Sequence, residues 1–253
     1  MGRLQDKVAV ITGAGTGMGR AMAMLFAKEG ARVAVLSRTA ANVDRTVRDI
    51  VDAGGAAMGI TIDISDAPAI KPAIDRVVET LGPVDILVNN AHDVSTVMSH
   101  VIDLGDAQLQ RQFDIGPFAY LHFMQACYPH MAGRYGRVIN FASCTGVSGD
   151  AGYTPYVMAK EAVRGLTRVA AREWGGEKIT VNCILPIAVT PGFTANSTQE
   201  EIPLEMPVLP IPRFGSPEED VAPVALFLAS ADAQYMTGYC MMVDGGHMID
   251  AGR

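Results

Sequence analysis

The sequence of 253 residues has few charged side chains, only four cysteines and no long apolar run. Asp, Glu, Lys and Arg make up 19% of it and hydrophobic residues 49%, whereas a disordered chain would show the opposite balance. The 20 Lys and Arg against 27 Asp and Glu give a formal net charge of −7. The chain therefore lacks the basic surface that binding to nucleic-acid phosphates requires. We expect a folded domain that binds no nucleic acid.

The few cysteines and the short apolar runs exclude further classes of protein. Cys127, Cys144, Cys183 and Cys240 lie far apart, with no C-x-x-C pair and no histidine at metal-ligand spacing, which predicts reduced thiols and no metal site. The N-terminal apolar run, residues 8–11, is too short for a signal peptide. No stretch reaches the ~18 to 20 apolar residues of a membrane span. We expect a soluble, cytoplasmic protein without a membrane partner.

Short apolar runs alternate with segments of helical periodicity along the whole chain. The predicted strands are residues 7–11, 32–36, 57–62, 85–88, 137–141, 179–184 and 239–243, and the predicted helices are residues 17–28, 42–53, 67–80, 107–131, 155–174 and 218–229. This alternation predicts a single doubly wound α/β domain over residues 1–253, with a mostly parallel seven-stranded sheet and helices on both faces. The proline-rich segment at about 187–217 predicts a substrate-binding loop.

A glycine-rich turn follows the first predicted strand, and Gly13, Gly17 and Gly19 fit the spacing G-x-x-x-G-x-G. Glycines let backbone N–H groups and a helix N-terminus approach a pyrophosphate, although the same residues could form a merely tight turn. The second strand ends in Ser37 and Arg38, where an NAD-binding protein usually has an acidic residue. A guanidinium there could hold a 2′-phosphate. We expect NADP(H) to be favoured and NAD(H) to be possible, unless Arg38 is only a solvated surface charge.

Tyr156 and Lys160 are four residues apart, which places both on one face of a predicted helix. Alone, such a pair is more often an exposed helix face. Ser143, however, lies just beyond the predicted strand 137–141, and the carboxyl ends of strands are where open α/β sheets bind ligands. A phenol beside an ammonium can act as a general acid/base. These three residues are the predicted catalytic group.

The order of motifs along the chain resembles the short-chain dehydrogenase/reductase family. The matching segments are TGAGTGMG at 12–19, Asp63, NNA at 89–91, Ser143, YVMAK at 156–160, VNCILP at 181–186 and TGYCMMVDGG at 237–246. The resemblance implies a Rossmann-type fold and a homotetramer formed through the long middle helices and the C-terminal strand region. It also implies an NAD(P)-dependent oxidoreductase that transfers a hydride between the nicotinamide and a ketone or secondary alcohol.

The resemblance also assigns roles to single residues. Tyr156 would be the general acid/base, Lys160 would lower the pKa of that tyrosine and hold the nicotinamide ribose, and Ser143 would bind the substrate oxygen. The implied cofactor site consists of Gly13, Thr16, Gly17, Met18, Gly19, Ser37, Arg38, Asp63, Ile64, Asn89, Ala91, Tyr156, Lys160, Pro186 and Thr190.

Three positions depart from the family pattern. His92 stands where the family has the glycine of NNAG, and could be a substrate contact, a second acid/base or, as we favour, part of the pocket wall. Gly116 stands where the family has a relay asparagine, which predicts an altered proton route. Ile187 replaces the glycine after Pro186, and Thr190 comes one position early.

The residues expected to face the substrate are largely apolar and include several methionines, which predicts a hydrophobic ketone or secondary alcohol. His92, Cys144 and Phe193 are the predicted substrate contacts. Two alternatives stay open: an NAD-dependent alcohol dehydrogenase with the same site, and a dinucleotide-binding sensor without catalysis.

Overall fold

The computed structural model describes residues 2–189 and 209–249. Seven strands within these ranges form one sheet. All the pairings between its strands are parallel, in the order β3-β2-β1-β4-β5-β6-β7, so the predicted doubly wound sheet is confirmed. The strands are β1 (Val8–Thr12), β2 (Arg32–Ser37), β3 (Ala56–Thr61), β4 (Ile86–Asn89), β5 (Gly136–Phe141), β6 (Ile179–Pro186) and β7 (Cys240–Val243).

Side chains of the central strands alternate between two buried layers. In β1, Ala9 and Ile11 pack into one hydrophobic cluster, whereas Val8 and Val10 pack into the other. Successive side chains of a strand point to opposite faces, so a strand covered on both faces must be apolar throughout. This explains why β1 and β4 read as continuous apolar runs.

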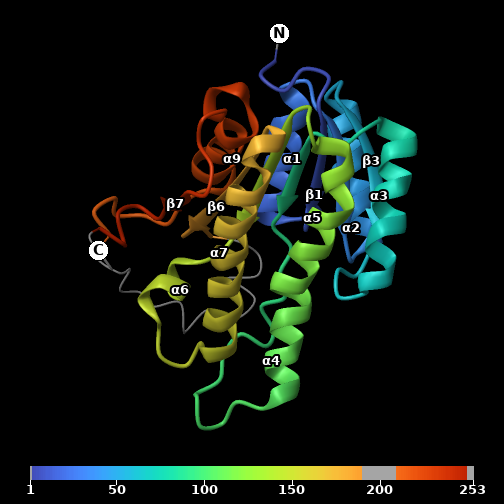
Figure 1. Cartoon of the computed structure of the whole chain (residues 1–253). Coiled ribbons are helices and arrows are strands. Elements are labelled where there is room, and N and C mark those ends of the chain that lie inside the picture. Colours follow the sequence, from blue (N-terminus) through green and yellow to red (C-terminus); the bar gives the residue numbers. More distant parts are fainter. Residues whose placement is uncertain (1, 190–208, 250–253) are drawn as a thin grey trace.

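Helices cover both faces of the sheet (Figure 1). One layer consists of α1 (Gly17–Lys28), α2 (Ala40–Asp52) and α9 (Ala222–Ala229). The other consists of α3 (Ala67–Leu81), α5 (Ala119–Met131) and α7 (Thr154–Trp174). In Figure 1, α5 and α7 cross the front of the sheet and α3 lies at its right. Within the described ranges, no helix is both long enough and apolar enough to cross a membrane.

The single helix predicted over residues 107–131 is wrong in one respect, because the segment is interrupted. It consists of α4 (Asp106–Phe113), the π-helical turn η1 (Asp114–Phe118) and α5. Pro117 has no N–H to donate to the preceding turn, and Gly116 leaves helical geometry with φ −110° and ψ −107°. The short helix α6 (Cys144–Ser148) was not predicted either. Figure 1 shows α4 and α6 below the sheet.

The strand order reverses between β1 and β4, and hydrogen bonds of the Thr12 side chain join the ends of these two strands. The Thr12 hydroxyl donates to the carbonyl of Val88 over 3.3 Å. The same oxygen accepts from the backbone N–H groups of Asn90 and Ala91, each over 3.0 Å. Ligands of doubly wound sheets bind at such a reversal, so the fold predicts a site at the carboxyl ends of these strands.

Candidate active site

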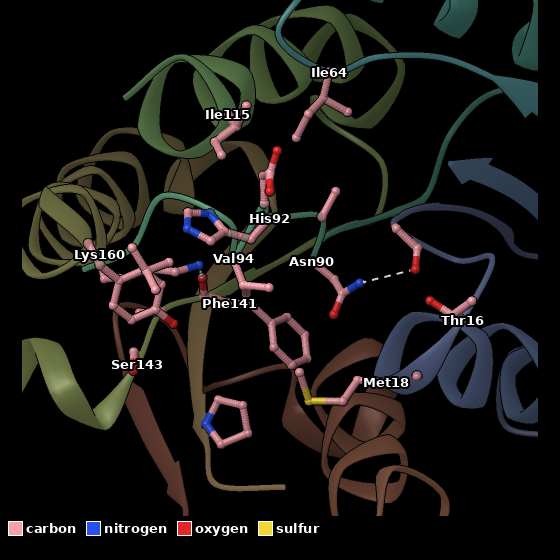
Figure 2. Close-up of a pocket in the computed structure, with 18 of the residues that line it drawn as sticks. Thr16, Met18, Ile64, Asn90, His92, Val94, Ile115, Phe141, Ser143 and Lys160 are labelled. Carbon is pink, nitrogen blue, oxygen red and sulfur yellow. Dashed lines mark hydrogen bonds between the residues drawn. The ribbon is translucent and has the colours of Figure 1, made fainter. Parts of the chain in front are cut away.

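A cavity of about 660 Å³ lies at the carboxyl ends of the strands. Figure 2 shows Thr16 and Met18 of the glycine turn at one end of it, and Ser143 and Lys160 at the other. The predicted catalytic group and the predicted cofactor turn therefore share one cavity.

The glycine turn has the shape and the free donors that an anion requires. Gly13 has φ +67°, and a Cβ at this position would lie 2.9 Å from the Cα of Ala91. Gly17, with φ +51°, begins α1, and the side chain of its N-cap Thr16 makes no capping hydrogen bond. The first N–H groups of a helix have no partner within the helix, and its N-terminus favours negative charge. The turn thus fits a dinucleotide pyrophosphate.

Gly19 and Asn89, both predicted to bind the cofactor, lie behind the cavity wall and do not line it. A Cβ at Gly19 would collide with the carbonyl of Gly13, so this glycine allows α1 to pack against the turn. Asn89 is fully buried, and its amide donates to the Asn140 side chain over 2.9 Å. Sequence reasoning missed Asn90, whose side-chain amide donates to the carbonyl of Thr12 over 2.9 Å and braces the turn.

Ser37, Arg38, Asp63 and Ile64, four residues of the expected cofactor site, also line the cavity. We assign the part of the cavity that they line to the adenosine half of a dinucleotide, and this assignment stays a prediction. The backbone N–H of Ser65 donates to Asp63 over 2.9 Å, and this hydrogen bond lowers the pKa of that carboxyl. Arg38 is exposed, but it does not project freely into solvent. Its Nη1 lies 3.4 Å from Oδ2 of Asp93.

Ser143, Tyr156 and Lys160 are brought together by β5, α6 and α7. Ser143 follows β5 as the N-cap of α6, where its Oγ accepts from the N–H of Thr145 over 3.2 Å. Tyr156 and Lys160 lie one turn apart near the start of α7. Lys160 is buried, and its Nζ donates to the carbonyl of Phe141 over 3.0 Å, at 5.6 Å from the centroid of the Tyr156 ring.

Burial acts on the pKa of both titratable members of this group. It raises the pKa of Tyr156, and a hydrogen bond with Ser143 offsets part of that increase. It lowers the pKa of Lys160 to about 8. The expected lowering of the Tyr156 pKa by Lys160 stays a prediction, since burial dominates the shift of the Tyr156 pKa in this structure. The phenol is therefore protonated at neutral pH, as a proton donor must be.

His92 lies beside Tyr156, with the ring centroids 5.2 Å apart in an edge-to-face arrangement. The Gln112 amide donates to Oγ1 of Thr96 over 2.8 Å and to the carbonyl of Asp93 over 3.3 Å, which leaves its oxygen as the acceptor for Nε2 of His92 over 2.8 Å. Nε2 must then carry the proton. Nδ1 is buried and has no hydrogen-bond partner among the described residues.

Burial lowers the pKa of His92 well below its usual value, so the imidazole is neutral. A Cβ at Gly116 would lie 3.8 Å from Cε1 of His92. The ring therefore borders Gly116, the position at which the sequence predicts an altered proton route.

The remaining predicted residues divide into lining residues and residues that the structure does not describe. Cys144 and Pro186 line the cavity, and burial raises the pKa of the Cys144 thiol to about 12. Thr190, Phe193 and most of the 187–217 loop lie outside the described residues. Sequence reasoning also missed Asp93 and Arg111, which belong to no motif. No cluster of metal-binding side chains occurs in the two described ranges.

Fold and site together define a doubly wound α/β protein with a glycine-rich turn and a Ser-Tyr-Lys group in one cavity. A family model described as enoyl-(acyl carrier protein) reductase matches residues 13–248. The chain is 33% identical to 12alpha-hydroxysteroid dehydrogenase from Clostridium sp., over 97% of this chain and 98% of that protein.

Two solved structures have the same fold. Carveol dehydrogenase from Mycobacterium avium in complex with NAD has a TM-score of 0.90 and 29% identity, over 99% of this chain and 100% of that one. A blue fluorescent protein from a metagenomic library, in complex with NADPH, has a TM-score of 0.87 and 32% identity, over 96% and 98%. The chain belongs to the short-chain dehydrogenase/reductase family and is an oxidoreductase.

Proposed function

We propose that the protein transfers a hydride between a nicotinamide dinucleotide and a ketone or secondary alcohol, with Tyr156 as the general acid/base. The observation that carries this proposal is the convergence of Ser143, Tyr156 and Lys160 on the cavity that also contains the glycine turn. Similar structures contain NAD in one case and NADPH in the other, which supports a nicotinamide cofactor.

The cofactor supplies the hydride chemistry, and the chain supplies orientation and proton transfer. The N-terminus of α1 and the backbone around Gly17 and Met18 hold the pyrophosphate. During ketone reduction, the Tyr156 phenol gives its proton to the carbonyl oxygen while the Ser143 hydroxyl hydrogen-bonds the same oxygen. Lys160 binds the nicotinamide ribose, and its ammonium is held in place by the carbonyl of Phe141. In alcohol oxidation, Tyr156 takes the proton back.

We propose a hydrophobic substrate, because the cavity that contains the catalytic group is also lined by Val94, Val97, Met98, Ile115 and Ile187. Arg38 favours NADP(H) through the 2′-phosphate. The alternative, an NAD-dependent alcohol dehydrogenase, is supported by the Asp93 carboxylate next to this arginine.

The test is a panel of cyclic, aromatic and aliphatic ketones and alcohols, assayed with NADPH, NADH and their oxidised forms by nicotinamide absorbance. The proposal predicts turnover of at least one hydrophobic carbonyl or carbinol. The Ser143→Ala variant should lose about 10²-fold or more in kcat/KM, because it removes a donor to the developing oxyanion. Tight dinucleotide binding without turnover of any panel member would indicate a sensor instead.

We further propose a homotetramer. Phe118 of η1, Val169 of α7 and Tyr239 beside β7 are exposed apolar side chains on the elements that the family resemblance assigns to subunit contacts. Light scattering should give a mass about four times that of the chain, and a stable monomer would contradict this assembly. The cytoplasmic location stays a prediction from the sequence.

A further inference from the structure

A carboxylate and two guanidinium groups meet at the adenosine end of the cavity. Arg38 comes from the end of β2, Asp93 from the segment after β4, and Arg111 from α4, and all three line the cavity. Oδ2 of Asp93 lies 3.4 Å from Nη1 of Arg38 and 3.2 Å from Nη2 of Arg111. One carboxylate oxygen thus serves both arginines.

Asp93 is fixed independently of Arg38. Its Oδ1 accepts from the backbone N–H of Ser95 over 3.0 Å and from the Ser95 hydroxyl over 2.7 Å. Arg111, its second partner, is itself anchored, because its Nη1 donates to the Ser65 hydroxyl over 3.0 Å. Hydrogen bonds from Ser95 and Arg111 hold the pKa of Asp93 far below its usual value, so this carboxyl is ionised throughout the working pH range.

Arg38, in contrast, is more exposed and has a longer contact. Its side chain is 63% exposed, whereas that of Asp93 is 18% exposed, and the ion pair joining them is long. Rotation of Arg38 toward another anion would leave the contacts of Asp93 with Ser95 and Arg111 intact. A 2′-phosphate that recruits Arg38 must therefore compete with a fixed carboxylate and lie close to its negative charge.

We infer that Asp93 sets the balance between the two nicotinamide dinucleotides by restraining Arg38. The inference rests on the proposed function. The end of β2 lacks the acidic residue that usually accepts from the ribose 2′-hydroxyl, and the fold brings Asp93 to the same place from 55 positions further along the chain. A phosphorylated ribose is attracted by Arg38 and repelled by Asp93, whereas an unphosphorylated ribose meets a carboxylate acceptor. The site consequently tolerates both dinucleotides.

The test measures dissociation constants for NADPH and NADH by nicotinamide fluorescence in the wild type, Asp93→Asn, Arg38→Ala and the double variant. Asp93→Asn removes the charge but keeps an oxygen for Ser95. It should change the ratio of NADPH to NADH affinity by about tenfold in favour of NADPH, the effect expected of one partly screened charge. In the Arg38→Ala background the same substitution should change the ratio by less than it does in the wild type, because only the direct repulsion between Asp93 and the 2′-phosphate remains.

Asp75→Asn is the matched control, since it removes one exposed carboxylate from α3, where Asp75 pairs with Lys71. This variant should leave the ratio unchanged. Thermal unfolding of each variant confirms that it is folded, and the ratio itself is insensitive to the fraction of active protein. A ratio that changes less than twofold in Asp93→Asn, or that moves toward NADH, would overturn the role of Asp93. Failure of the wild type to bind either dinucleotide would instead overturn the proposed function.

Discussion

Replacement of Lys160 by methionine should stabilise the protein while it disables the active site. Burial lowers the pKa of Lys160 from 10.5 to about 8. At roughly 1.4 kcal/mol per pKa unit, the fold disfavours the ammonium by about 3 kcal/mol. Methionine is apolar and of similar length, so it removes this penalty. It also removes the hydrogen bond to the carbonyl of Phe141, which costs about 1 kcal/mol.

The net expectation is a free energy of unfolding about 2 kcal/mol above that of the wild type at pH 7.5. The advantage depends on pH in a defined direction. Between pH 8 and 10.5 the unfolded chain binds the lysine proton more tightly than the folded protein does, so the wild type gains stability as pH rises. By pH 9.5 the advantage of Lys160→Met should fall below about 1 kcal/mol.

Urea unfolding at both pH values measures this difference. The control is Lys71→Met, because Lys71 is an exposed residue on α3, and it should stay within about 0.5 kcal/mol of the wild type at both pH values. Lys160→Met should also lose at least about a hundredfold in kcat/KM. A Lys160→Met protein that is less stable than the wild type at pH 7.5, or whose advantage does not change with pH, would refute this reasoning.

Two further predictions concern residues around the site. Gln112→Ala removes a fully buried amide that forms hydrogen bonds with His92, Thr96 and the carbonyl of Asp93. Urea unfolding should therefore show that the free energy of unfolding falls by about 3 kcal/mol. A decrease of less than about 1 kcal/mol would contradict the assigned hydrogen bonds. Gly13→Ala places a Cβ against Ala91 at a positive φ and should weaken dinucleotide binding at least about tenfold. The control is Gly165→Ala, because a Cβ at this position of α7 meets open space. This control should leave dinucleotide binding unchanged and raise the free energy of unfolding by about 0.5 to 1 kcal/mol. Equal effects of the two glycine variants on dinucleotide binding would contradict the proposed role of the glycine turn.

Most of the fold could be predicted because apolar periodicity reports burial directly. The five-residue run of β1 is buried throughout, as its continuous apolar run predicted. The break at Gly116 and Pro117 was missed, because the apolar pattern continues through it while the backbone hydrogen bonding does not. Helix α6 was missed since five residues are too few to show a helical period.

The site was predictable where its residues belong to motifs that are local in sequence. The glycine turn and the Tyr156–Lys160 pair are of this kind. The pairing of Arg38 with Asp93 depends on two strand ends that meet only in the fold, so no local pattern reports it. The neutral state of His92 also needs the structure, because it follows from burial and from the orientation of Gln112.

The central claim is that Tyr156 transfers the proton during catalysis, and the kinetics of Tyr156→Phe test it most directly. With a substrate identified in the panel, this variant should lose about 10² to 10⁴ in kcat/KM while it binds the dinucleotide with nearly unchanged affinity. Tyr128→Phe, which changes a tyrosine packed against Trp174, serves as the control and should retain full activity. Retention of full turnover by Tyr156→Phe would contradict the mechanism.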